Sequence, residues 1–231
     1  MMMAALFLIF FEFENGAVFS GYNDIGIPGN TGTRFSMTDD LSSSTAYYYR
    51  LRGGLVINSR HHLTALYAPL LVKSKGTLSR DVNFQGETFA AGTKLNGEFK
   101  FNSYRLTYRY DIVSDERWTA GLGLTLKVRD AYVSLEGGGK NAKKSDLGFV
   151  PLVNFHIGYR LHPRFTVYCE GDALAAPQGR AEDILAGASY DINGTLSVFG
   201  GYRLLEGGAD NDRVYTFSMF HYAAAGVRAV F

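Results

Sequence analysis

The feature that most constrains this chain is a period-two alternation of apolar and polar residues that recurs in long segments. In SYRLTYRY, residues 103–110, aromatic and apolar residues occupy the even positions and polar residues the odd ones. The same alternation runs through FHIGYRL, residues 155–161, and AYYYRLRGGL, residues 46–55. An extended strand sorts alternate residues onto two faces, whereas a helix would spread them around its axis. These segments therefore predict β-strands.

The strands come in a regular series. We predict about ten of them, with eight to twelve compatible with the pattern, near residues 12–22, 44–57, 62–74, 96–111, 117–134, 146–161, 165–174, 182–192, 195–205 and 214–231. Many reach the length of about 9–11 residues that a tilted strand needs to cross a bilayer.

The connections between these strands alternate in length. Short turns are predicted at NSRHH, SDE, HPR and DING, whereas residues 23–43, 75–95, 135–145, 175–181 and 206–213 read as long polar loops. Short turns at one rim and long loops at the other are typical of a transmembrane barrel. The fold class is therefore all-β, an antiparallel up-and-down transmembrane β-barrel. Loops on such a rigid scaffold commonly carry binding.

The two faces of each strand differ in a way that orients the barrel wall. The apolar sets carry aromatic residues near strand ends, where an interfacial girdle would lie. The polar sets mix Arg with Gly and Thr, unlike the Lys/Glu coat of a soluble surface. Charged residues make up 19% of the chain, below the usual ~25%. We therefore expect the apolar faces to point outward, into lipid.

Composition also excludes several classes of partner and site. The net charge of +1 gives no reason to expect nucleic acid as a partner. The single cysteine, Cys169, allows neither an internal disulfide nor a cysteine-based metal site. We predict no metal and no cofactor.

The chain closes on FHYAAAGVRAVF, residues 220–231, in which Phe231, Ala229 and Val227 share one face of a strand. A terminal Phe preceded by alternating apolar residues resembles the C-terminal signature of bacterial outer-membrane β-barrel proteins. The resemblance implies that this segment is the assembly signal read by the barrel-assembly machinery. It further implies the Gram-negative outer membrane as the location, with membrane lipids and lipopolysaccharide as neighbours. The expected state is a monomer.

The N-terminal stretch MMMAALFLIFF, residues 1–11, has the length of the apolar core of a signal peptide but lacks a basic start and an A-x-A cleavage site. It is interpreted as a truncated signal peptide or as an apolar N-terminal segment. Residues 12–231 are then predicted to form a single outer-membrane barrel domain.

The inward faces of the predicted strands carry many charges. Inward parity assigns to one lumen charge network Arg50, Arg52, Arg105, Arg109, Lys127, Arg129, Arg160, Glu170, Asp172, Arg203 and Arg228, with Glu12 and Glu14 as further carboxylates. Buried charges must be paired or wet, and barrels of about eight strands are filled by side chains. We therefore expect a filled, charge-paired lumen and a structural or surface-interaction role. Because basic residues outnumber acidic ones, a narrow channel for small anionic solutes is the alternative.

A hydrolase is a further alternative, and the sequence disfavours it. Omptin-like proteases use Asp and His at the outer rim of a barrel of about ten strands. Here His61, His62 and His162 fall at the short-turn end. Lipid A deacylases carry an outward His with Ser two residues on, whereas His221 is followed by Ala223. No catalytic residue is predicted, and catalysis is not the expected role.

Overall fold

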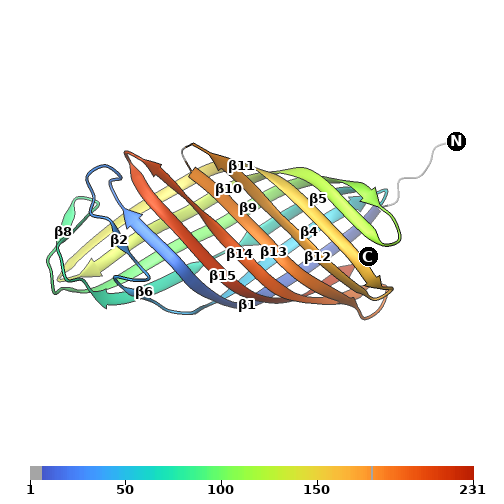
Figure 1. Ribbon diagram of the computed structural model, residues 1–231, viewed down its shortest axis with the longest axis horizontal. Helices are drawn as coiled ribbons and strands as arrows, with labels where there is room; N and C mark the ends of the chain where they lie inside the picture. Colours follow the sequence, from blue (N-terminus) through green and yellow to red (C-terminus); the bar gives the residue numbers. More distant parts are fainter. Residues whose placement is uncertain (1–6, 178) are drawn as a thin grey trace.

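The computed structural model describes residues 7–177 and 179–231, and the regular elements in these ranges are β-strands (Figure 1). They are β1 (Phe7–Gly26), β2 (Phe35–Ser36), β3 (Ser42–Ser43), β4 (Ala46–Ile57), β5 (His61–Ala68), β6 (Leu71–Thr77), β7 (Val82–Phe84), β8 (Glu87–Phe89), β9 (Lys94–Ser114), β10 (Trp118–Gly137), β11 (Lys140–His162), β12 (Phe165–Ala176), β13 (Gly179–Asp191), β14 (Leu196–Asn211) and β15 (Val214–Val230). No helix among the described residues is long and apolar enough to cross a membrane.

Ten long strands form a closed antiparallel ring. Its order is β1–β4–β5–β9–β10–β11–β12–β13–β14–β15, and β15 pairs with β1. The short strand β6 continues the path of β5 along β9. The predicted fold class and the prediction of about ten strands are confirmed. A barrel of this size leaves an interior that side chains can fill.

The two ends of the chain meet at the seam of the ring. Phe10 lies opposite Val230, and the backbone amide of Phe231 donates to the carbonyl oxygen of Ile9 at 2.8 Å. The Ile9 amide donates back to the Phe231 carbonyl at 2.9 Å. Phe231 itself is exposed on the outer face. The last residue is thus held in the sheet, as the terminal alternation predicts.

The first strand begins earlier than the predicted domain boundary at residue 12. Residues 7–11 pair with residues 53–57 of β4 and lie in the barrel wall. Residues 7–11 of the predicted N-terminal segment, interpreted as a truncated signal peptide or an apolar segment, therefore form part of β1. The rest of the predicted segment, residues 1–6, lies outside the described residues.

Several segments predicted as long loops are hairpins. β10 and β11 continue through residues 135–145 and are joined by Gly138 and Gly139, at φ values of 58° and 76°. These positive φ values favour glycine and suit a two-residue hairpin turn. Likewise β14 and β15 run to Asn211 and from Val214. These strand ends carry polar residues on both faces, so their composition resembles that of a loop.

The outer face of the ring carries a belt of exposed apolar side chains. Leu124 of β10 is 66% exposed, Phe149 of β11 is 63% exposed and Phe11 of β1 is 60% exposed. Exposing so many large apolar side chains to water would cost free energy, so this face suits contact with lipid. The prediction that the apolar faces point outward is confirmed.

Aromatic rings border this belt toward both ends of the barrel. Tyr67 stacks on Tyr104 with ring centroids 5.2 Å apart, on the side of the long connections, here called the loop end. Trp118 and Tyr159 lie 4.6 Å apart on the side of the short turns, called the turn end. Aromatic girdles at both interfaces are typical of outer-membrane barrels.

A small folded cap covers part of the loop end, where β2, β3 and the β7–β8 hairpin gather (Figure 1). Phe35 and Phe84 meet edge to face at 6.1 Å, and Met37 and Val82 are fully buried in the same core. The connections at 23–43 and 75–95 are therefore ordered. Their apolar residues hold the cap together, so the cap presents its polar residues to solvent.

An ion pair also ties the cap. Arg80 donates to both carboxylate oxygens of Asp40, at 3.0 and 2.8 Å. These hydrogen bonds hold the pKa of the Asp40 carboxyl below its usual range.

Candidate functional site

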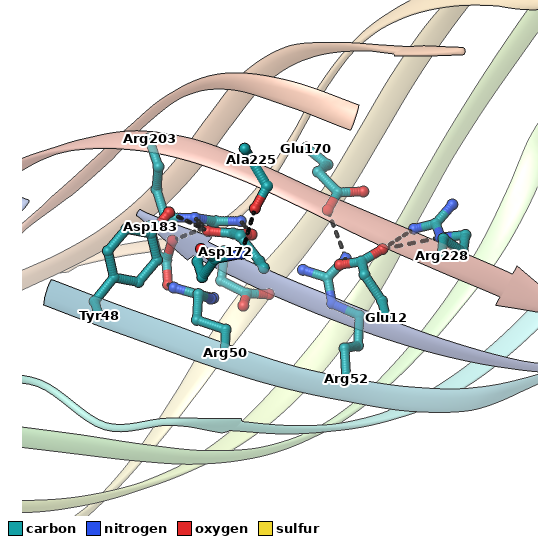
Figure 2. A network of polar contacts seen from close by, with 12 residues as sticks. Glu12, Tyr48, Arg50, Arg52, Glu170, Asp172, Asp183, Arg203, Ala225 and Arg228 are labelled. Atoms are coloured by element: carbon teal, nitrogen blue, oxygen red, sulfur yellow. Dashed lines mark hydrogen bonds and ion pairs between the residues drawn. The ribbon is translucent and has the colours of Figure 1, made fainter. Parts of the chain in front are cut away.

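Three arginines from three strands converge on one carboxylate in the middle of the barrel. Asp183 of β13 accepts from Arg50 at 2.9 Å, from Arg105 at 2.6 Å and from Arg203 at 2.6 Å (Figure 2). All four side chains are buried. These side chains come from β4, β9, β13 and β14. They meet inside the ring because each lies on the inward face of its strand.

Two further carboxylates complete this mid-barrel cluster. Glu14 of β1 receives a two-pronged contact from Arg203, at 2.8 and 2.6 Å, and a hydrogen bond from the Tyr48 hydroxyl at 3.0 Å. Asp172 of β12 accepts from Arg105 at 2.6 Å. Its other oxygen accepts from the Thr125 hydroxyl at 2.6 Å and from the Asn154 amide at 2.8 Å.

The charges of this cluster balance. We define the central network as Glu14, Arg50, Arg105, Asp172, Asp183 and Arg203, which is three cations against three anions. Desolvating a charge costs several kcal/mol unless it is paired and hydrogen bonded. The planar guanidinium suits two-pronged pairing with carboxylates, which explains why arginine and not lysine fills these positions.

A second cluster lies toward the turn end (Figure 2). Arg52 donates to Glu170 at 2.6 Å and approaches Glu12 at 3.4 Å, while Arg228 donates to Glu12 at 2.5 Å. His156 lies 3.4 Å from Glu170. This turn-end cluster joins β1, β4, β11, β12 and β15 across the lumen.

The residues predicted for one lumen network divide into separate groups. Arg50, Arg105, Asp172 and Arg203 lie in the central network, and Arg52, Glu170 and Arg228 lie in the turn-end cluster. The remaining four lie elsewhere: Arg109 pairs with Asp111, Arg129 pairs with Asp146, Arg160 is exposed near a short turn, and Lys127 faces a cavity. Parity alone could not separate these groups, because it fixes the face of a residue but not its height along the barrel.

Sequence reasoning missed the residue at the centre of the network. Asp183 follows Glu182, and only one of two adjacent carboxylates can face the lumen. Asp183 shares its parity with Leu185, an apolar residue that the structure buries in the lumen, so the alternation of this strand gave no signal for an inward Asp183.

The central network lies beside two cavities of the lumen. The lower one, of about 150 Å³, is lined by residues of both clusters and by His62 and Arg109. The upper one, of about 370 Å³, is lined by Phe101, Lys127, Leu205 and Phe220 among others, and by no member of the central network. A gap of only about 10 Å³ lies between Leu205, Phe101 and the network.

The histidines lie apart from one another along the barrel or contact different partners. His62 bonds Asp111 at 2.8 Å and His61 bonds Tyr108 at 2.9 Å, both at the turn end. His221 bonds the Tyr202 hydroxyl at 2.6 Å. Among the described residues, no group of three or more His, Cys, Asp or Glu side chains is arranged to hold a metal ion.

Comparisons with known proteins agree on the fold. No family model and no curated protein matches the chain. The solved outer-membrane protease OmpT from Escherichia coli is 10% identical, with 97% of each chain covered and a TM-score of 0.57. An outer-membrane channel from Pseudomonas putida is 10% identical, with 100% of this chain and 97% of that chain covered and a TM-score of 0.48. Ail, the attachment invasion locus protein of Yersinia pestis, is 11% identical, with 96% and 99% covered and a TM-score of 0.43.

At such low identity the similarity is one of fold, not of activity. The closed antiparallel ring, the apolar belt and its aromatic borders agree with it. The chain therefore has the fold of outer-membrane β-barrel proteins, with an outer face that suits lipid.

Proposed function

We propose that this protein is a closed barrel with a structural or surface-interaction role in the outer membrane, and not an open pore. The observation that carries the proposal is the central network. Its six charged side chains come from β1, β4, β9, β12, β13 and β14 and meet at 2.6–2.9 Å inside the lumen. A solute would have to break several buried ion pairs in order to pass.

The cap supports the surface side of the proposal. Its core residues are buried, while the tip of the β7–β8 hairpin exposes Gln85, Gly86 and Glu87. A surface that is already ordered loses less conformational entropy when it binds a partner. By the usual orientation of outer-membrane barrels, the loop end faces the exterior of the cell.

The alternative is a narrow path for small anions, which requires the network to open. Conductance across planar bilayers separates the two functions. We expect the wild-type barrel to show no stepwise openings. The double variant Asp183→Ala with Arg50→Ala removes a cation and an anion together and is expected to show small openings.

A matched control changes a pair outside the network. The double variant Arg129→Ala with Asp146→Ala removes an ion pair near the upper cavity and should stay closed. Anion-selective openings of the wild-type protein would contradict the closed-barrel proposal and favour the anion path.

A further inference from the structure

The upper cavity is a built chamber with one buried lysine that has no ion-pair partner among the described residues. Lys127 of β10 is 3% exposed and lines the chamber. Among the described residues, no carboxylate lies within ion-pair distance of its ammonium. Its one close contact of note is the face of Phe101, whose ring centroid lies 4.6 Å from Nζ. A cation–π contact offsets only part of the cost of burying a charge.

The neighbours of Lys127 do not neutralise it. Arg105 lies directly opposite on β9 and is itself a cation, and the nearby carboxylates of Asp172 and Asp183 already accept from it. The acidic residues of the chamber are also engaged. Asp146 pairs with Arg129, and Glu206 receives two-pronged donation from Arg180 at 2.8–3.0 Å.

The chamber therefore holds positive charge that its own carboxylates leave unpaired. Lys144 also lines it and has no ion pair among the described residues. Nε of Arg129 is buried without an acceptor. Cationic groups left in this state predict an anionic ligand, since an anion would supply the missing partner.

The chamber wall also carries a set of apolar side chains between its polar residues. It includes Phe99, Phe101, Val150, Leu205 and Phe220. A volume of about 370 Å³ lies in the range of sites that hold small organic molecules. A small inorganic anion would leave this apolar surface uncovered, so the ligand that fits is an amphiphile with one anionic group.

The barrel wall is interrupted beside the chamber. Among the described residues, β11 pairs with β12 only from Val153 onward, whereas residues 140–152 of β11 pair with β10 alone. The chamber is lined by residues of β11 and of β13 but by none of β12, the strand between them. In Figure 1, β12 and β13 end short of the tips of the neighbouring hairpins at the loop end.

This stretch of β11 without a β12 partner is here called the side notch, and apolar side chains border it on the outer face. Leu147 and Phe149 of β11 are 75% and 63% exposed on the outer face next to it. An apolar chain could pass from the outer leaflet into the chamber without crossing water.

We propose that the upper chamber binds a single-chain anionic amphiphile, a carboxylate or phosphate on an apolar chain. The amphiphile enters through the side notch and pairs with Lys127. The proposal is independent of whether the lumen conducts, because the central network lies outside the chamber.

The test uses the full-length protein in phosphatidylcholine nanodiscs. The reporter is dansyl-labelled undecanoate, with empty nanodiscs as the background. We expect saturable binding to the wild-type protein and at least about tenfold weaker binding to Lys127→Met. The control variant Lys75→Met changes an exposed lysine of β6 outside the chamber and should bind like the wild type. Folding of each variant is checked by the migration of unheated samples on gels. If Lys127→Met does not fold, Lys127→Gln is used in its place.

The competitors identify the ligand class. Dodecyl phosphate should displace the reporter, whereas inorganic phosphate and acetate should not. If inorganic phosphate competes as well as dodecyl phosphate, the site takes a free anion and the amphiphile assignment fails. Equal affinity for Lys127→Met and wild type, or for the neutral carboxamide of the reporter, would overturn the proposal.

Discussion

Replacing Asp183 by asparagine should be among the most costly single changes inside the barrel. Asp183 accepts from three guanidinium groups at 2.6–2.9 Å, and all four side chains are at most 6% exposed. After Asp183→Asn, three arginines face two carboxylates, so one positive charge stays buried without a partner. Breaking a buried ion pair in this way costs about 3–5 kcal/mol. Because the asparagine oxygen can still accept one hydrogen bond, we expect about 3 kcal/mol.

The assay is urea unfolding in lipid vesicles, followed by the fluorescence of Trp118. This is the only tryptophan of the chain, and it lies on the outer face, 46% exposed. The matched control is Asp146→Asn, which removes a carboxylate from a partly exposed ion pair. That change should cost at most about 1 kcal/mol.

A second variant tests the charge balance itself. Among the described residues, Arg50 forms an ion pair with the network only through Asp183, and its Nε has no acceptor. Adding Arg50→Gln to Asp183→Asn restores equal numbers of cations and anions and should recover at least about 1 kcal/mol. The reasoning is refuted if Asp183→Asn costs no more than Asp146→Asn, or if Arg50→Gln makes the variant less stable still.

Three other predictions concern the belt, the seam and the cap. Leu124→Arg puts a charge on the lipid face and should cost about 2–4 kcal/mol in the same assay, whereas Glu136→Arg, on the same face of β10 beyond the belt, should cost about 1 kcal/mol or less. Phe231→Ser should lower the yield of folded barrel in the outer membrane while Ser197→Ala does not; equal yields in membrane fractions would argue against an assembly signal. The pKa of Asp40 is lowered in the folded protein, so its ion pair with Arg80 stabilises the cap above the unfolded pKa of about 3.9 and is lost as pH falls through the lower folded value. Amide exchange in residues 78–93 should then be faster in Asp40→Asn than in wild type at pH near 6, with the difference gone well below pH 3.9; a difference that persists in acid would contradict this assignment.

Much of the barrel could be predicted from local pattern, because a strand in a barrel wall carries its orientation in its own alternation. Tyr104 and Arg105 lie on the faces that parity assigns to them. The composition of a segment was a less reliable guide to whether it forms a strand or a loop. Residues 135–145 resemble a long polar loop, yet Gly138 and Gly139 form the tight turn of a long hairpin.

The candidate site was only partly predictable for a different reason. Arg105 and Asp172 meet because β9 and β12 face each other across the lumen, a relation that no local pattern carries. Likewise Phe35 and Phe84 meet only because two separate connections fold over the same rim. Height along the barrel and contacts across it depend on the pairing register of the whole ring.

During folding, the pairing of β1 with β15 at the seam differs from the other strand pairings of the ring. Most neighbouring strands of the ring follow one another closely along the chain, whereas Arg228 and Glu12 meet across the seam from 216 positions apart. Contacts of high sequence separation are slow to form, because the closure entropy must be met before the contact stabilises anything. We expect the hairpins to form first and to leave an open, curved sheet with two unpaired edges. Until those edges meet, the sheet could pair with another chain instead, so the lifetime of this open form sets the competition between insertion and aggregation.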